Sequence, residues 1–315
     1  MRVILFDSLT ILTLSTVLIG TSMAQTQTQL TPGDHTRSLV VANRERSYLV
    51  HVPRSYDGLK PVSVVLAFHG GASNAAQMVH FCGLNEKADE AGFLVVYPNG
   101  TGRTEQFLTW NAGNCCGYAK DQKVDDVEFV GKLLDDLAGV ANIDADRVYA
   151  TGMSNGGMMS YLLAAKLSDR IAAIAPVGGP MGIAECHPER PVSVLHFHGL
   201  DDKFAPFKGG RGERSLSQTD FYSVEHSLGC WIKANDCASE PEVAEEPVKV
   251  EDAMRVIKKT WGGGKGGAEV VLVEIAGAGH TWPGRQPPLL FLGKSTKNIA
   301  ANDAMWDFFK KHPRK

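Results

Sequence analysis

The stretch RVYATGMSNGGMMSYLLA, residues 147–164, indicates how this 315-residue chain folds. It opens with an apolar run typical of a buried strand (residues 147–151), and a helical pattern follows at residues 155–167. Between them, Gly152, Ser154 and Gly156 match G-x-S-x-G, in which the glycines allow a sharp turn from strand to helix. Such a turn presents the serine above a sheet, beside a helix N-terminus that favours developing negative charge. A Gly-Ser pair also occurs in ordinary turns, but this context predicts that Ser154 is a nucleophile.

Strand-like and helix-like segments alternate along the whole chain. Short apolar runs typical of buried strands recur at residues 62–68, 93–97, 171–177, 192–197 and 269–275. Helical patterns lie between and after them, at residues 74–91, 125–140, 221–234 and 299–311, and Asp125 with Glu128 forms an acidic capping pattern. This alternation predicts the fold class α/β, with a mostly parallel central sheet and helices on both faces.

The remaining segments predict edges and loops. Alternating patterns at residues 39–42 and 48–52 predict two antiparallel edge strands. Residues 101–123 are expected to form a long loop and residues 238–248 a surface loop, and the glycine run 262–267 is interpreted as a turn between a helix and the last strand. Without a repeat or a clear linker, residues 25–315 are expected to form a single domain.

The first 24 residues resemble a secretory signal peptide. A short positive start is followed by an apolar run of small residues, and Ser22 and Ala24 suit a cleavage site before Gln25. The alternative is a short N-terminal anchor that stays attached, although the run is shorter than a spanning helix needs. We expect a secreted protein, extracellular or periplasmic, with no membrane association after cleavage.

Composition excludes several classes of protein. The chain is 43% hydrophobic with a formal charge of −3, so it is not a disordered chain. It lacks the basic excess that a nucleic-acid-binding protein needs. No metal site is expected, because the spacing of His, Cys and Asp resembles no closed zinc site. The glycine run at 262–267 lacks the context of a phosphate-binding loop.

An elbow serine requires donors for the oxyanion. One should be the backbone N–H of Asn155, which follows the serine. The other should come from the loop after an earlier strand, and His69-Gly70-Gly71 ends such a strand. The N–H of Gly71 is the predicted second donor, and His69 is interpreted as a packing residue that shapes the loop.

The acid and the base should follow the serine in the order Ser, acid, His. Residues 192–197 lead into Asp201 and Asp202, so the acid is expected in this strand-end loop. His280 follows the last strand in a glycine-rich loop, where it can take the serine proton. The other candidate histidines are interpreted as core or surface residues: His187, His196, His198 and His226.

Taken together, these motifs resemble a known family. The segments LAFHGGASN, TWNAGNCCGYA, VDDVEFV, HFHGLDD and GAGHTWPG, with the elbow, are similar to the polyhydroxybutyrate depolymerase / feruloyl esterase group, related to carbohydrate esterase family 1. The resemblance runs from about residue 45 to 311. It implies an α/β-hydrolase fold and a secreted serine esterase that needs no cofactor.

Carried over by position, the resemblance implies a role for individual residues. Ser154 is the nucleophile, Asp202 the acid of HG-x-x-D, and His280 the base. The residues implied to flank or bind the substrate are Trp110, Asn111 and Trp282. One departure concerns Asp201, which occupies a slot that is usually small and uncharged in the family.

Six cysteines remain after signal cleavage. Export permits disulfides, and six cysteines allow 15 pairings, which the sequence leaves open. The family resemblance implies that Cys115, Cys116, Cys186 and Cys237 stand at positions where such proteins often have cysteines. Cys82 and Cys230 are additional to that pattern. Cys115 and Cys116 are expected to bond to different partners rather than to each other, and most of the six thiols are expected to be oxidised.

These observations predict a serine carboxylic ester hydrolase that acts on an extracellular polymer or an aromatic-acid ester. Feruloyl esters of plant polysaccharides and 3-hydroxybutyrate polyester or its oligomers both remain open, and acetyl xylan is an alternative. A secreted serine peptidase on the same fold would use the same three residues. A catalytically inactive binding protein would require a broken triad.

Overall fold

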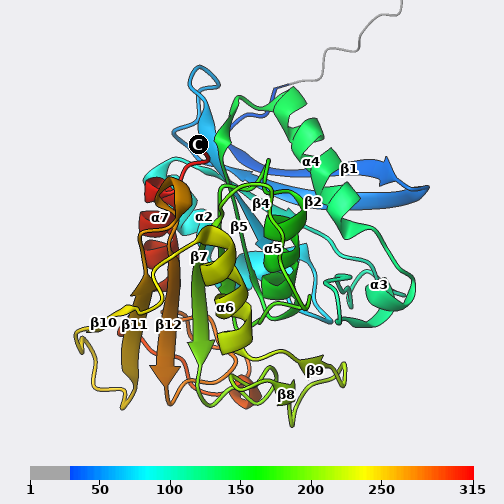
Figure 1. Cartoon of the computed structure of the whole chain (residues 1–315). Helices are drawn as coiled ribbons and strands as arrows, with labels where there is room; N and C mark the ends of the chain where they lie inside the picture. The colour runs from blue at the N-terminus through cyan, green and yellow to red at the C-terminus, as the bar shows by residue number, and fades with distance from the viewer. Residues whose placement is uncertain (1–28) are drawn as a thin grey trace, which may run out of the picture.

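The computed structural model describes residues 29–315, so the predicted signal peptide lies outside the described residues. Ten strands form one sheet in the order β1-β2-β4-β3-β5-β6-β7-β12-β11-β10 (Figure 1). The strands are β1 (Gly33–Val41), β2 (Arg44–Val52), β3 (Val62–Phe68), β4 (Leu94–Pro98), β5 (Ile143–Met153), β6 (Ala173–Val177), β7 (Ser193–Gly199), β10 (Glu242–Glu245), β11 (Arg255–Trp261) and β12 (Val270–Ala276). A separate two-stranded sheet joins β8 (Gly210–Arg211) to β9 (Asp220–Phe221).

The centre of the large sheet is parallel and its edges are antiparallel. Every neighbouring pair from β4 through β3, β5, β6 and β7 to β12 is parallel. At one edge β1, β2 and β4 pair antiparallel, and at the other β12, β11 and β10 do so. The sequence-based expectation of a mostly parallel sheet with antiparallel edge strands near the N-terminus is therefore confirmed.

Helices cover both faces of the sheet because the central strands are apolar on both sides. In β3, Val64, Leu66 and Phe68 join one hydrophobic core, while Val65 and Ala67 join the other. This separation follows from the alternation of side chains along a strand. The first core lies beneath α4 (Asp126–Val140), α5 (Asn155–Lys166) and α6 (Val224–Asn235), and the second beneath α1 (Ala75–Cys82), α2 (Leu84–Ala91) and α7 (Ala301–Lys311).

Local signals explain where two of the helices begin and end. The side chain of Asp125 accepts a hydrogen bond from the N–H of Glu128, which confirms the capping pattern at α4. The helix expected over residues 74–91 is two helices, because Gly83 takes the left-handed conformation (φ 61°) and ends α1. A β-carbon at Gly83 would also meet the guanidinium group of Arg285.

Three loop assignments are corrected by the structure. The expected surface loop 238–248 contains β10, and the glycine run 262–267 follows the strand β11 rather than a helix. Strand β11 is only partly buried and lies next to the edge strand β10, so its residues lack the continuous apolar run of the central strands. The loop 101–123 contains the short helix α3 (Gly117–Asp121).

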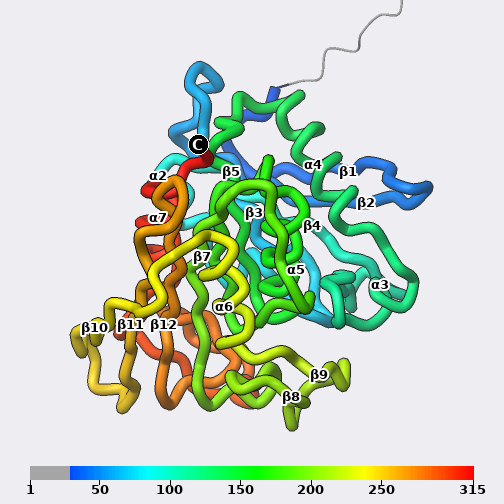
Figure 2. The backbone as a smooth tube through the Cα atoms, in the orientation of Figure 1, coloured from blue at the N-terminus to red at the C-terminus, as the bar shows by residue number. Residues whose placement is uncertain are grey.

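The segments beyond the carboxyl ends of the parallel strands lie together. In the orientation of Figure 2, β7 and β12 run downward, and the segment with β8 and β9 lies below their ends. Ligand sites of open α/β sheets lie at this end of the strands. Among residues 29–315, no helix is long and apolar enough to cross a membrane.

Candidate active site

Ser154 occupies the sharp turn between β5 and α5. Its backbone has φ 57° and ψ −119°, a conformation that is strained for a residue with a side chain. A β-carbon at Gly152 would lie 2.5 Å from the carbonyl carbon of Gly156, and one at Gly156 would lie 2.2 Å from the Phe68 oxygen. The two glycines of the motif are therefore required by close backbone approach, and Ser154 is held partly exposed at the end of the strand.

The loops after β7 and β12 bring His280 and Asp202 into contact. The Nδ1 of His280 and the Oδ2 of Asp202 are 2.6 Å apart, and both residues are buried. Oδ1 of the same carboxylate accepts hydrogen bonds from the backbone N–H groups of Phe204 (2.8 Å) and Ala205 (2.9 Å). Contacts to both carboxylate oxygens thereby fix the position of the Asp202 side chain.

The environment of Asp202 keeps the carboxylate ionised. Burial alone would raise the pKa of Asp202, but the attraction and hydrogen bond of His280, the nearby His198 and the backbone donors outweigh it, and the pKa is lowered. Asp201 is exposed, and its N–H donates to the oxygen of Ala278. Of the two neighbouring acids, the structure brings only Asp202 to His280.

Ser154 and His280 both line one cavity of about 1070 Å³. Its walls come from α1, the elbow and the loops around residues 215–217 and 284–292. The aromatic ring of Phe204 stacks on His280, with 5.0 Å between the ring centroids. Among the side chains that line the cavity, no sequence motif predicted the apolar residues Met78, Phe81, Met158, Phe204, Leu216, Phe221, Leu289, Phe291 and Leu292. They come from loops and helices that are far apart in sequence, and no motif marks them.

The two expected oxyanion donors lie side by side at the edge of this cavity. Gly71 and Asn155 both line it, and a β-carbon at Gly71 would be 3.8 Å from the β-carbon of Asn155. Within residues 29–315, the N–H of Gly71 donates to no protein acceptor. Beneath this loop, burial lowers the pKa of His69 to about 4, and its Nε2 accepts from the N–H of Gly100 at 3.0 Å. His69 thus shapes the loop as a neutral residue.

The three residues expected to bind substrate do not line the cavity. Trp110 is fully buried, and its indole N–H donates to the oxygen of His69 (3.0 Å). Trp282 is 1% exposed, and its indole N–H donates to Oδ1 of Asn302 (2.8 Å). The amide of Asn111 donates to the oxygen of Val124 (2.9 Å). Their polar atoms are used to hold loops together, and their contact with substrate stays a prediction.

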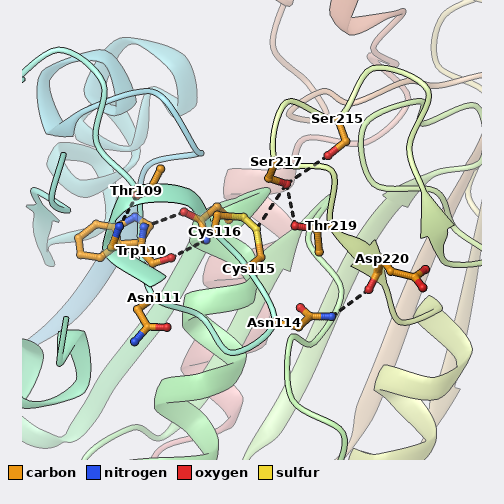
Figure 3. Close-up of a disulfide and its surroundings, with 12 residues drawn as sticks. Thr109, Trp110, Asn111, Asn114, Cys115, Cys116, Ser215, Ser217, Thr219 and Asp220 are labelled. Atoms are coloured by element: carbon orange, nitrogen blue, oxygen red, sulfur yellow. Dashed lines mark hydrogen bonds between the residues drawn. A yellow bond between two sulfur atoms is a disulfide. The ribbon is translucent and has the colours of Figure 1, made fainter. Parts of the chain in front are cut away.

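Cys115 and Cys116 are disulfide-bonded to each other, which contradicts the expectation of separate partners. Both project from one turn of the 109–117 loop, and the sulfur of Cys115 lies 3.8 Å from Oγ of Ser217 (Figure 3). Both also line the cavity. The other four cysteines of the chain fall within the described residues and are not paired: Cys82, Cys186, Cys230 and Cys237. That most of the six thiols are oxidised stays a prediction.

No group of three or more His, Cys, Asp or Glu side chains within residues 29–315 could hold a metal ion. The groups brought together at the cavity include the hydroxyl of Ser154, the imidazole of His280 and, behind it, the carboxylate of Asp202.

Comparison with known proteins identifies a family. Residues 46–195 match the family described as esterase PHB depolymerase. The protein named "Putative esterase NocK" of Nocardia uniformis subsp. tsuyamanensis is 30% identical over 288 residues, with 86% of this chain and 81% of NocK covered. Feruloyl esterase B of Piromyces equi is 28% identical, and the match covers 75% of this chain but only 42% of that longer enzyme.

Solved structures agree in fold. The acetyl xylan esterase from Aspergillus awamori superposes with a TM-score of 0.56 at 12% identity, covering 78% of this chain and 94% of that one. An S-formylglutathione hydrolase from Agrobacterium tumefaciens has a TM-score of 0.56 at 14% identity, with 89% and 95% covered. With the similarity to NocK over most of both chains, these findings show that the chain belongs to the esterase PHB depolymerase family and is a serine ester hydrolase of the α/β-hydrolase fold.

Proposed function

We propose that this esterase works through a Ser154-His280-Asp202 triad. His280 takes the proton of the serine hydroxyl as Oγ attacks the ester carbonyl, while Asp202 holds the imidazole and stabilises its protonated form. The backbone N–H groups of Gly71 and Asn155 bind the oxyanion. His280 then protonates the leaving alcohol, and it activates the water that releases the acid from Ser154.

The observation that carries the proposal is the 2.6 Å contact between His280 Nδ1 and Asp202 Oδ2, on a histidine that shares its cavity with the elbow serine. A carboxylate that accepts the Nδ1 proton leaves Nε2 as the basic nitrogen, as the reaction requires.

For the substrate we propose an ester of an extracellular polymer or of an aromatic acid. The size of the cavity, about 1070 Å³, and its apolar walls suit an acyl group larger than acetyl. Four phenylalanine rings line the cavity, Phe81, Phe204, Phe221 and Phe291, and they suit a feruloyl group or an apolar hydroxybutyrate oligomer. The match of this chain to an enzyme named acetylxylan esterase/xylanase keeps acetyl xylan as the alternative.

We further propose that residues 1–24 direct export, to the cell exterior or the periplasm, and that residues 25–315 form one catalytic domain without a cofactor. The N-terminal sequence and the continuous ten-stranded sheet support this arrangement. N-terminal sequencing of the protein recovered from culture medium and periplasm should begin at Gln25. A start at Met1 in a membrane fraction would favour a retained anchor.

Purified mature protein tests the chemistry and the substrate together. Hydrolysis of p-nitrophenyl butyrate without cleavage of a chromogenic peptide is expected, whereas the reverse result would favour a peptidase. Methyl ferulate, acetylated xylan and hydroxybutyrate oligomers, compared by kcat/KM, then rank the substrates. Preference for acetylated xylan over both larger acyl groups would contradict the substrate proposed here.

A further inference from the structure

Three buried side chains extend from the carboxylate of Asp202 into the core. Nε2 of His198 lies 3.6 Å from Oδ2 of Asp202, and Nδ1 of His198 lies 3.0 Å from Nε2 of His196. Nδ1 of His196 in turn lies 2.9 Å from the hydroxyl of Tyr161 on α5. All three side chains are at most 1% exposed, and the sequence analysis had placed both histidines in the core or on the surface.

The partners along this chain determine which nitrogen carries each proton. Nε2 of His198 lies 2.8 Å from the oxygen of Ala205, a pure acceptor, so this nitrogen carries a proton. Nδ1 of a neutral His198 then accepts from Nε2–H of His196, and Nδ1 of His196 accepts from the Tyr161 hydroxyl. The hydrogen bonds point the same way, from Tyr161 through both histidines to the Ala205 oxygen, and the last N–H also lies 3.6 Å (N to O) from Oδ2 of Asp202.

Burial keeps the three groups neutral. It lowers the pKa of His198 and lowers that of His196 well below its ordinary value, and it raises the pKa of Tyr161 well above its own. Two sets of titratable groups face the chain: Asp202 and His280 at one end, and the thiols of Cys186 and Cys230 near Tyr161 at the other. Burial also raises the pKa of both thiols, so they are neutral at pH 7.

We propose that His198 is a positioning residue for Asp202, and that His196 and Tyr161 hold it in the tautomer that turns an N–H toward the carboxylate. This inference rests on the proposed triad. An N–H facing Oδ2 withdraws part of the carboxylate charge from His280 and keeps the carboxylate turned toward it. The opposite tautomer would direct a lone pair at both Oδ2 and the Ala205 oxygen, which is repulsive in this buried setting.

Two variants of similar length separate this role from packing. His198→Gln retains an N–H that can reach the Ala205 oxygen, whereas His198→Met has none. Without that N–H the carboxylate attracts the imidazolium of His280 more strongly. The acidic limb of the kcat/KM profile for His198→Met should therefore move to higher pH by about 0.5 units, a threefold change in the protonation equilibrium, while His198→Gln should follow the wild type. The proposal would be overturned if the acidic limb of His198→Met lay at the same pH as that of the wild type. It would also be overturned if the limb shifted equally in both variants.

Nitrogen-15 spectra of histidine-labelled protein test the tautomers independently of activity. His196 and His198 should both show Nε2–H and no titration between pH 5 and 8, and a charged or Nδ1–H form of either would contradict the assignment. If His198→Met does not fold, Tyr161→Phe replaces it, with a smaller shift of the limb in the same direction expected and an unmoved limb counting against the proposal. An active Ser154→Ala enzyme would instead overturn the proposed triad and leave these spectra unchanged.

Discussion

The side-chain amide of Asn155 binds both polar atoms of the Trp110 backbone. Its Oδ1 accepts from the N–H of Trp110 at 2.8 Å, and its Nδ2 donates to the oxygen of Trp110 at 3.1 Å. Asn155 begins α5 directly after the elbow serine, and Trp110 lies on the loop that carries Cys115 and Cys116 to the cavity. The residue after the nucleophile therefore joins one wall of the cavity to the elbow.

Removal of the Asn155 side-chain amide should make the loop that carries Trp110 more mobile, while the backbone N–H of residue 155 stays in place. Asn155→Ala deprives the buried N–H of Trp110 of its acceptor and removes one of the two donors to the Trp110 oxygen, so we expect a loss of about 2 kcal/mol in the free energy of unfolding. We also expect kcat/KM to fall about tenfold through the displaced loop. Asn142→Ala, which removes an amide bonded to the oxygen of Gly58 far from the cavity, is the control and should lower stability alone. Unchanged kcat/KM in Asn155→Ala would show that the wall does not depend on this residue.

Replacement of the nucleophile should abolish activity without unfolding the protein. Ser154 is partly exposed at the elbow, and alanine removes only its hydroxyl group, so Ser154→Ala should melt near the wild-type temperature. Loss of a triad serine reduces kcat by about 10⁴ to 10⁶. Steady-state kinetics on p-nitrophenyl butyrate measure this loss, and one tenth of the activity remaining would mean that another residue attacks.

Replacement of Asp202 should reduce activity far more than replacement of the neighbouring Asp201. Asp202→Asn keeps the shape of the side chain but supports the wrong tautomer of His280, which costs about 10⁴ in the best-studied triad. Asp201 is exposed and has no contact with His280, so Asp201→Asn should stay within about tenfold of the wild type. Kinetics of both variants on one soluble ester decide between them, and an inactive Asp201→Asn beside an active Asp202→Asn would reverse the assignment.

The free energy of unfolding should decrease as the pH falls, because His69 is buried in its neutral form. Burial lowers the pKa of this group to about 4 in the folded state, whereas the unfolded chain titrates near 6.5. A depressed folded-state pKa means that the folded state binds fewer protons, so the contribution is complete above pH 6.5 and is lost as the pH falls toward 4. The loss reaches about 3 kcal/mol at most.

The variant His69→Gln can still accept from the N–H of Gly100 and has no proton to take up. Urea unfolding at pH 7 and pH 4.5 should therefore show a smaller change for His69→Gln than for the wild type. Identical pH dependence in the two proteins would show that His69 does not titrate with unfolding.

The thiol of Cys82 should react only after unfolding. The residue is fully buried, and burial raises the pKa of its thiol to about 12. A thiol reagent at pH 8 should label Cys237, which is only partly buried, in the folded protein, and Cys82 only in denaturant. Peptide mapping identifies the labelled residues, and rapid labelling of native Cys82 would indicate that α1 opens.

The sequence alone determined the parallel centre of the sheet and predicted that Ser154, Asp202 and His280 form the triad. Buried strands require continuous apolar runs, and a nucleophile at the end of a strand requires glycines at set distances, so both leave patterns within a few residues. Strand β11, which lies next to the edge strand β10, was missed because it is only partly buried and carries no such run.

Only the tertiary structure decided what surrounds these residues. Trp110 and Trp282 lie near catalytic motifs in sequence, yet each indole is buried against a loop, while the cavity is lined by side chains such as Phe81 and Phe291 from distant segments. His198 and His280 help to lower the pKa of the Asp202 carboxyl group. The two histidines lie close to it because β7 pairs with β12. Local patterns specify backbone geometry, whereas burial and side-chain partners depend on contacts between segments far apart in the chain, which no local pattern records.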